Sequence, residues 1–216
     1  MDLQLNGKLA LVSASTAGIG LAIAESLAGE GADVIVNGRT KERVAAAGKQ
    51  VRSSARGKVH ELAADLATAE GVAEAIARYP EVDILVNNLG IYDPKPFVEI
   101  PDEDWMRMFE INVMSGVRLS RHYFPLMRAK NWGRIVFISS ESALQIPAEM
   151  IHYGMTKAAQ LAIARGLAET TKGTGVTVNS VLPGPTMSEG LDEFVTSVVR
   201  DATITREQFE EHFFKH

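Results

Sequence analysis

The sequence lacks several features that would assign it to other classes of protein. None of its 216 residues is a cysteine, which excludes disulfides, thiolate metal ligands and a cysteine nucleophile. Its five histidines do not have the spacing of metal ligands, so no metal site is predicted. There is no dense run of lysine or arginine, and the formal net charge is −5, which argues against nucleic acids and anionic membranes as partners.

Long apolar segments are also missing. No stretch of the sequence is long enough to span a bilayer, and the short apolar stretch near the start has no signal-peptide cleavage pattern. We therefore expect a cytoplasmic protein. Hydrophobic residues make up 46% and charged residues 23%, which is typical of globular proteins, and the length fits one domain over residues 1–216.

Short apolar segments alternate with helical patterns along the chain. We predict strands at residues 8–13, 33–37, 59–62, 83–87, 134–139 and 176–182, and helices at residues 19–29, 41–53, 69–77, 102–130 and 151–172. The strands are almost continuously apolar, as a parallel sheet requires when helices cover both of its faces. The sequence therefore predicts an α/β fold with a doubly wound, Rossmann-like parallel sheet, whose ligands bind at the carboxyl ends of the strands.

The first strand and the first helix are joined by a turn of small residues, Ser-Ala-Ser-Thr-Ala-Gly-Ile-Gly at residues 13–20. Small residues let the backbone approach a pyrophosphate, and a helix N-terminus attracts an anion. The turn therefore predicts a dinucleotide site, with contacts from Ser15, Thr16, Gly18, Ile19 and Gly20. A tight strand-to-helix turn without a ligand would favour similar residues.

The end of the second strand bears on which dinucleotide binds. It reads Val-Asn-Gly-Arg-Thr at residues 36–40, with no acidic residue to bind the ribose hydroxyls and with Arg39 available to form a charged fork with a 2′-phosphate. This pattern favours NADP(H) and leaves NAD(H) as the alternative. A solvated surface arginine is the competing interpretation of Arg39.

Polar residues that could take part in catalysis follow the later strands. Tyr153 and Lys157 are four residues apart, so a helix places them on one face. A free tyrosine titrates near pH 10 and needs an adjacent cation to act as a base, which Lys157 would supply. Such a pair alone could equally be an exposed helical pair. Ser140, thirteen residues before Tyr153, follows a predicted strand.

The whole set of motifs resembles the short-chain dehydrogenase/reductase family. In that family the first turn reads Thr-Gly-x-x-x-Gly-x-Gly, so Ser13-Ala14 here stands in place of Thr-Gly, and the turn must be one that Ala14 can adopt. The resemblance implies that Ser140 hydrogen-bonds the substrate oxygen and that Tyr153 exchanges the proton. It also implies that Lys157 holds the nicotinamide ribose and lowers the tyrosine pKa.

The resemblance extends to further positions. Asn112 matches a helix asparagine that keeps a water near the lysine, and Asp65 and Leu66 match a segment that contacts the adenine. Asn88 and Gly90 match the family's Asn-Asn-Ala-Gly motif, with Leu89 in place of alanine. A final motif, Pro183, Gly184 and Thr186, matches a turn that binds the carboxamide and phosphates. Without a ligand, Asn112 could be a structural asparagine and Asn88 part of a capping turn.

These residues imply an NADP(H)-dependent oxidoreductase that moves a hydride to or from a carbonyl or secondary alcohol. A 3-oxoacyl thioester, a steroid-like ketone and a sugar-derived ketone remain open as substrates. The expected substrate side is apolar and consists of Leu89, Leu144, Ile146, Met150, Met187 and Phe194. The alternative function is a catalytically silent cofactor-binding regulator or scaffold, against which the four catalytic-type residues argue.

Two expectations concern assembly and the end of the chain. The family pairs the helices at residues 102–130 and 151–172 into a four-helix bundle, which implies a homodimer or homotetramer. The residues expected to permit this packing, unless they face the chain's own core, are Val117, Phe124, Ala158, Leu161 and Ala162.

Residues 188–216 are expected to form a substrate-covering helical segment, with helices at 188–200 and 205–214 and a capping box from Thr205 to Gln208. The family usually continues with another helix and strand, so we expect this chain to lack both and the native polypeptide to be longer. The alternative is a short protein whose sheet edge is covered by another subunit.

Overall fold

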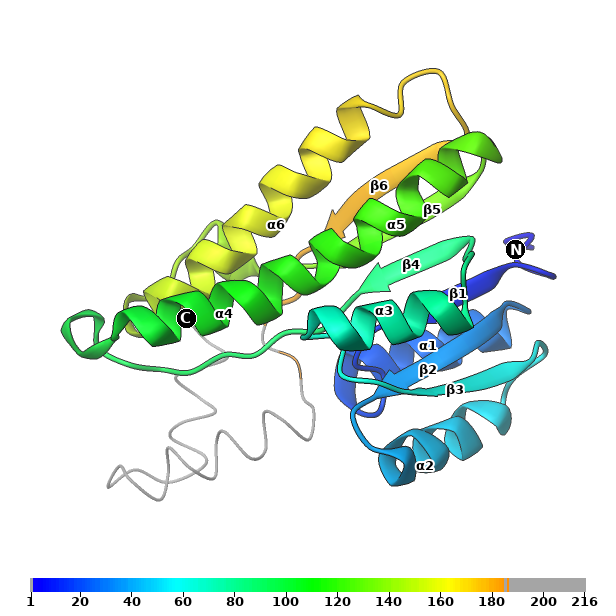
Figure 1. The fold of residues 1–216 in the computed structure, drawn as a ribbon, viewed down its shortest axis with the longest axis horizontal. Coiled ribbons are helices and arrows are strands. Elements are labelled where there is room, and N and C mark those ends of the chain that lie inside the picture. Colours follow the sequence, from blue (N-terminus) through cyan, green and yellow to red (C-terminus); the bar gives the residue numbers. More distant parts are fainter. Residues whose placement is uncertain (1, 185, 187–216) are drawn as a thin grey trace.

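A parallel β-sheet forms the centre of the fold in the computed structural model, which describes residues 2–184 and 186 (Figure 1). Its strands within those residues are β1 (Leu9–Val12), β2 (Asp33–Gly38), β3 (Val59–Ala63), β4 (Ile84–Asn87), β5 (Gly133–Ile138) and β6 (Val176–Val181). They lie in the order β3-β2-β1-β4-β5-β6, and every neighbouring pair is parallel. The doubly wound prediction is confirmed, and the strand order reverses between β1 and β4.

Helices cover both faces of this sheet. They are α1 (Gly18–Gly29), α2 (Lys41–Arg52), α3 (Ala69–Arg78), α4 (Asp102–Phe109), α5 (Ser115–Ala129) and α6 (Ile151–Glu169). Successive strand residues point to opposite faces, so Ala10 and Val12 pack with α1 and α2, whereas Leu11 packs with α3, α5 and α6. Burial on both faces explains why the strands are apolar at nearly every position.

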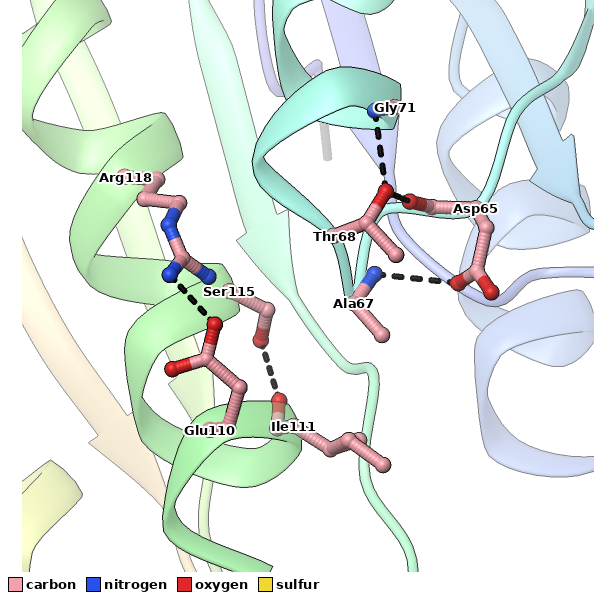
Figure 2. A network of polar contacts seen from close by, with 8 residues as sticks. All are labelled: Asp65, Ala67, Thr68, Gly71, Glu110, Ile111, Ser115 and Arg118. Atoms are coloured by element: carbon pink, nitrogen blue, oxygen red, sulfur yellow. Dashed lines mark hydrogen bonds and ion pairs between the residues drawn. The ribbon is translucent and has the colours of Figure 1, made fainter. Parts of the chain in front are cut away.

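The helix predicted at residues 102–130 is wrong in one respect, because the structure interrupts it with a π-helix, Glu110–Met114. The Ser115 hydroxyl donates to the Ile111 carbonyl at 2.5 Å, and Arg118 forms an ion pair with Glu110 across this wider turn (Figure 2). The apolar pattern continues through this segment, so the sequence periodicity did not predict the π-helix. Turns of this kind are frequent at functional sites.

Two further findings concern the sequence predictions on membrane spans and on the end of the chain. Within the described residues, no helix is both long and apolar enough to cross a membrane. The helices predicted at 188–200 and 205–214, and any last helix and strand, lie outside the described residues.

Candidate active site

The turn between β1 and α1 is built from close backbone contacts. Ala14 adopts a left-handed conformation with φ of +51°, and its backbone N–H donates to Asn37 Oδ1 at 3.0 Å. A Cβ atom at Gly20 would lie 2.4 Å from Asn88 Nδ2 and 2.5 Å from the Ala14 carbonyl oxygen. Glycine at position 20 is therefore required by packing, whether or not a ligand binds.

Ser15 has a structural role in this turn. Its hydroxyl donates to the Val12 carbonyl at 2.8 Å and accepts from the Asn37 N–H at 2.9 Å, and the residue is fully buried. The Asn37 amide in turn donates to the carbonyls of Leu62 and Ala64, so it joins β1, β2 and β3 at one edge. Asn37 was not singled out from the sequence, although a lone asparagine ending an apolar strand was a visible signal.

The N-terminus of α1 differs from those of α2 and α3. Thr40 and Thr68 cap the latter two by accepting from backbone N–H groups, as Figure 2 shows for Thr68 and Gly71. Ala17 gives α1 no side-chain cap, and the first turn of α1 contains no acidic residue. Uncapped N–H groups and the positive end of the helix dipole suit a phosphate.

A groove of about 430 Å³ runs along the side of α1 from Gly18 to Leu27, and Thr186 also lines it. The predicted phosphate turn and the predicted Thr186 contact are therefore brought together. The small residues of the turn and the uncapped helix end fit the pyrophosphate of a dinucleotide.

Arg39 follows β2 directly and is exposed to solvent. Its side chain forms no hydrogen bond or ion pair with any described residue. A Cβ atom at Gly38 would lie 2.4 Å from Thr16 Cγ2, so the Thr16 side chain packs beside the end of β2 that carries Arg39. Both predicted residues therefore lie at the carboxyl end of β2.

Asp65 and Leu66 order the loop that leads into α3. Asp65 Oδ1 accepts from the Ala67 N–H at 3.1 Å, and its carbonyl accepts from the Thr68 hydroxyl (Figure 2). Leu66 is 2% exposed and belongs to the core. Their predicted contact with an adenine stays a prediction, and Leu66 has little surface to offer it.

The ends of β1 and β4 are joined across the point where the strand order reverses. Asn88 Nδ2 donates to the carbonyls of Ser13 and Ala14, each at 3.0 Å, and the Ser13 hydroxyl accepts from the backbone N–H groups of Asn88 and Leu89. Leu89 is partly buried and packs against the core, and its predicted place on the substrate side stays a prediction. A Cβ atom at Gly90 would lie 3.4 Å from Lys157 Nζ.

The end of β5 brings the predicted catalytic residues together. Ser140 caps a 3-10 helix, Glu141–Ala143, by accepting from the Ser142 N–H at 3.1 Å. The Ser139 hydroxyl donates to the Lys157 carbonyl at 2.9 Å, which ties β5 to α6. The Ser140 side chain also lies close enough to Tyr153 to lower the pKa of its phenol.

The electrostatics of Tyr153 and Lys157 differ from the prediction. Burial raises the pKa of Tyr153, and the nearby Ser140 side chain opposes this shift. Burial also lowers the pKa of Lys157 to about 8. Lys157 Nζ donates to the Ile138 carbonyl at 3.0 Å and lies 5.5 Å from the centre of the Tyr153 ring. The ammonium is thus directed at a carbonyl, and the expected lowering of the tyrosine pKa by Lys157 is not found in this arrangement.

Asn112 lies inside the π-helix and is almost fully buried. Its Oδ1 accepts from the Ile91 N–H at 2.7 Å, and its Nδ2 donates to the Ile91 carbonyl at 2.9 Å and to Thr156 Oγ1 at 3.1 Å. This amide therefore fastens the segment after Gly90 to α6, beside Lys157. The structural interpretation of Asn112 is satisfied, and its predicted water-holding role is untested.

The predicted Pro-Gly turn lies beside the catalytic residues. The Glu141 N–H donates to the Pro183 carbonyl at 3.0 Å, and a Cβ atom at Gly184 would lie 3.1 Å from Glu141 Oε2. Thr186 Oγ1 donates to the Gly184 carbonyl at 2.9 Å.

Several apolar residues border this site. Leu144 and Ile146 are 73% and 50% exposed, and Met150 is half-buried at the start of α6. Met187 and Phe194 lie outside the described residues.

Two neighbours of Tyr153 were missed in the sequence analysis. One is Tyr92, whose ring meets that of Tyr153 edge-on at 6.3 Å, and the other is the buried His152, whose pKa is lowered by burial. Neither belongs to a motif, so no sequence signal pointed to them.

Within the described part of the chain, no group of three or more histidine, aspartate or glutamate side chains could hold a metal ion.

Comparison with known proteins places this arrangement among related chains. The family model described as short chain dehydrogenase matches residues 8–197. The "uncharacterized oxidoreductase YvaG" of Bacillus subtilis is 49% identical over the whole of this chain and 82% of its own length. A 3-oxoacyl-[acyl-carrier-protein] reductase of Aquifex aeolicus is 34% identical, over 85% of this chain and 76% of its own.

A solved structure is similar over almost the whole chain. L-sorbose reductase from Gluconobacter frateurii, complexed with NADPH and L-sorbose, aligns with a TM-score of 0.90 and 32% identity. The alignment covers 98% of this chain and 82% of that protein.

Proposed function

The chain belongs to the short-chain dehydrogenase family, and we propose from this membership that it transfers a hydride between a nicotinamide dinucleotide and a carbonyl or secondary alcohol. The observation that carries the proposal is that Ser140, just after β5, lies close enough to Tyr153 on α6 to lower the pKa of its phenol, with Lys157 buried on the same helix face. In a purely structural role, three such polar groups would have no reason to meet at the carboxyl edge of a parallel sheet.

In this proposal the cofactor phosphates lie at the uncapped N-terminus of α1. Thr16, Gly18, Ile19 and Gly20 supply the backbone cradle there, and Thr186 lines the groove along α1 together with Gly18 and Ile19. When bound, the dinucleotide supplies or accepts the hydride. Gly90 leaves room beside Lys157, where the ammonium would hold the nicotinamide ribose.

The protein's own groups handle the proton. The hydroxyls of Ser140 and Tyr153 would both donate to a substrate carbonyl oxygen, and the phenol would give up its proton as the alcohol forms. The raised pKa of Tyr153 keeps the phenol protonated, which suits the reductive direction. Among the described residues, Ser140 is the group that lowers that pKa.

We propose NADP(H) as the preferred cofactor. Arg39 stands exposed directly after β2, no acidic residue is present at residues 36–40, and Thr16 packs beside the same strand end. A guanidinium in this position can form a charged fork with a ribose phosphate. The NADPH bound by the similar L-sorbose reductase agrees with this assignment.

The substrate class is best tested by a panel of carbonyl compounds. Purified protein would be incubated with NADPH and a 3-oxoacyl thioester, L-sorbose or a steroid ketone, and NADPH oxidation would be followed. The proposal expects turnover of at least one compound. Tight NADPH binding without turnover of any carbonyl would instead support the regulator or scaffold, and failure to bind either dinucleotide would contradict both.

We further propose that the protein acts in the cytoplasm as a homodimer or homotetramer assembled through α5 and α6. Val117, Ala158 and Leu161 are half-buried and Ala162 is exposed, so these helices have small and apolar surface outside the core. Phe124 packs partly against the core and contributes less. Light scattering after gel filtration measures the mass directly, and a monomer would contradict the assembly.

A further inference from the structure

A buried glutamine connects the π-helix to the candidate catalytic lysine. Gln160 lies on α6, three residues after Lys157, and is 1% exposed. Its Nε2 donates to the main-chain carbonyl of Asn112 at 2.6 Å, and its Oε1 accepts from Lys157 Nζ at 3.5 Å. Both polar atoms of the Gln160 amide therefore form hydrogen bonds.

The contact depends on the irregular backbone of Glu110–Met114. The Asn112 side chain is bonded to Ile91 and to Thr156 on α6, and its main-chain carbonyl makes a second contact with α6 by accepting from Gln160. Ser115 and the ion pair between Glu110 and Arg118 brace the same π-helix on its own segment (Figure 2). Gln160 is thus the side chain through which this turn reaches Lys157.

Packing alone does not account for an amide at this position. Burying a glutamine costs side-chain entropy and requires partners for its polar atoms. Leucine would fill a similar volume at a smaller entropic cost and with no polar atoms to satisfy. A polar role for Gln160 is the simpler explanation of its presence.

We propose that Gln160 is a positioning residue that holds the Lys157 ammonium group by joining it to the main chain at Asn112. Together with the Ile138 carbonyl, it gives the buried ammonium two oxygen acceptors. An amide bonds without titrating, so the bridge stabilises the charged lysine and passes no proton itself. The proposal rests on the proposed function for its catalytic meaning, since Lys157 is the residue assigned to the ribose.

Few ionisable groups in the described part of the chain surround Lys157, so a change in its pKa can be attributed to Gln160. Among the described residues, Tyr153 is the titratable group that faces it, at 5.5 Å from the ring centre to Nζ. The groups that approach from β5, the π-helix and the turn after β4 are Ile138, Asn112 and Gly90, none of which carries a charge. Burial is the cause that lowers the lysine pKa to about 8.

The test is to titrate Lys157 by NMR in protein carrying isotope-labelled lysine, with the signal assigned from a Lys157→Met sample. No substrate or cofactor is added. Gln160→Leu removes an acceptor from the ammonium and should lower the pKa of Lys157 by about one unit. Gln160→Glu places a carboxylate there and should raise it by a similar amount. Gln50→Leu, which removes an exposed amide on α2, is the matched control and should change nothing.

An unchanged lysine pKa in both Gln160 variants would overturn the proposal, and if Gln160→Leu does not fold, Gln160→Glu decides alone. With a carbonyl compound turned over in the panel, the basic limb of kcat should move to lower pH in Gln160→Leu. A limb that stays in place while the lysine pKa moves would also contradict the positioning role. A panel without turnover would defeat the proposed function and leave the NMR result standing.

Discussion

Replacing Ala14 with glycine should stabilise the protein, although it removes a methyl group from the edge of the proposed cofactor site. Ala14 has a φ of +51°, in the left-handed region that side chains with a Cβ atom adopt at a cost. The residue is half-buried and belongs to neither face of the core, so little packing is lost with its methyl. The hydrogen bond from its N–H to Asn37 involves the backbone and is kept.

Two opposing effects determine the size of the change. The left-handed conformation costs a residue other than glycine about 1–2 kcal/mol. Glycine gives the unfolded chain more freedom, which costs about 0.4–1 kcal/mol. The difference is a gain of about 0.5–1 kcal/mol in the free energy of unfolding, or roughly 2–4 °C in Tm at the upper end for a chain of this size.

Urea unfolding of the wild type and Ala14→Gly measures this difference. Ala22→Gly is the matched control, because Ala22 is exposed on α1 with a helical backbone, and glycine there should destabilise by about 1 kcal/mol. The two substitutions are chemically identical and should have opposite signs. A loss of stability in Ala14→Gly equal to that in Ala22→Gly would refute the argument from strain.

Three further predictions concern single residues. Arg39→Ala should weaken NADPH binding about tenfold and leave NADH binding unchanged, because a charged hydrogen bond contributes about 1.5–3 kcal/mol. Fluorescence titration of both cofactors measures this, and an unchanged preference for NADPH would remove Arg39 from the site. Gly20→Ala should destabilise by about 1–3 kcal/mol in urea unfolding, because its Cβ would meet Asn88 and the Ala14 carbonyl, and wild-type stability would contradict the close packing. For Lys157, burial lowers the pKa from 10.5 to about 8, so the unfolded state binds the proton more tightly and stability should rise as pH increases from about 8 to 10.5, by up to about 3 kcal/mol. Unfolding measured across that pH range should show no such rise in stability for Lys157→Met. Parallel pH profiles of stability for the wild type and Lys157→Met would contradict the lowered pKa of Lys157.

Features that repeat along the chain could be predicted from the sequence. Apolar strands alternating with helices gave the parallel sheet, and motifs at strand ends such as Ser140 and Asn88 fell where the topology gathers them. The spacing of Tyr153 and Lys157 predicted a shared helix face, and both lie on α6. Local patterns suffice here because the positions follow from regular geometry.

Features that depend on individual contacts could not be predicted. The π-helix at Asn112 leaves the apolar period intact, so the pattern concealed it. Ser15 was assigned to the cofactor because of its place in the turn, but its hydroxyl is bonded within the protein. The direction of the Lys157 ammonium depends on the Ile138 carbonyl and the Gln160 amide nearby, and Gln160 lies just outside the Tyr-x-x-x-Lys motif.

The central claim, that Tyr153 exchanges the proton in a carbonyl reduction, is tested most directly by Tyr153→Phe. The ring packing is kept and the phenol oxygen is removed, so the fold and NADPH affinity should be unchanged. Turnover of the best carbonyl from the panel should fall by about 100-fold or more, the usual contribution of a positioned acid. A folded variant that binds NADPH normally and keeps even about a tenth of wild-type turnover, far more than the loss of a general acid allows, would contradict the account.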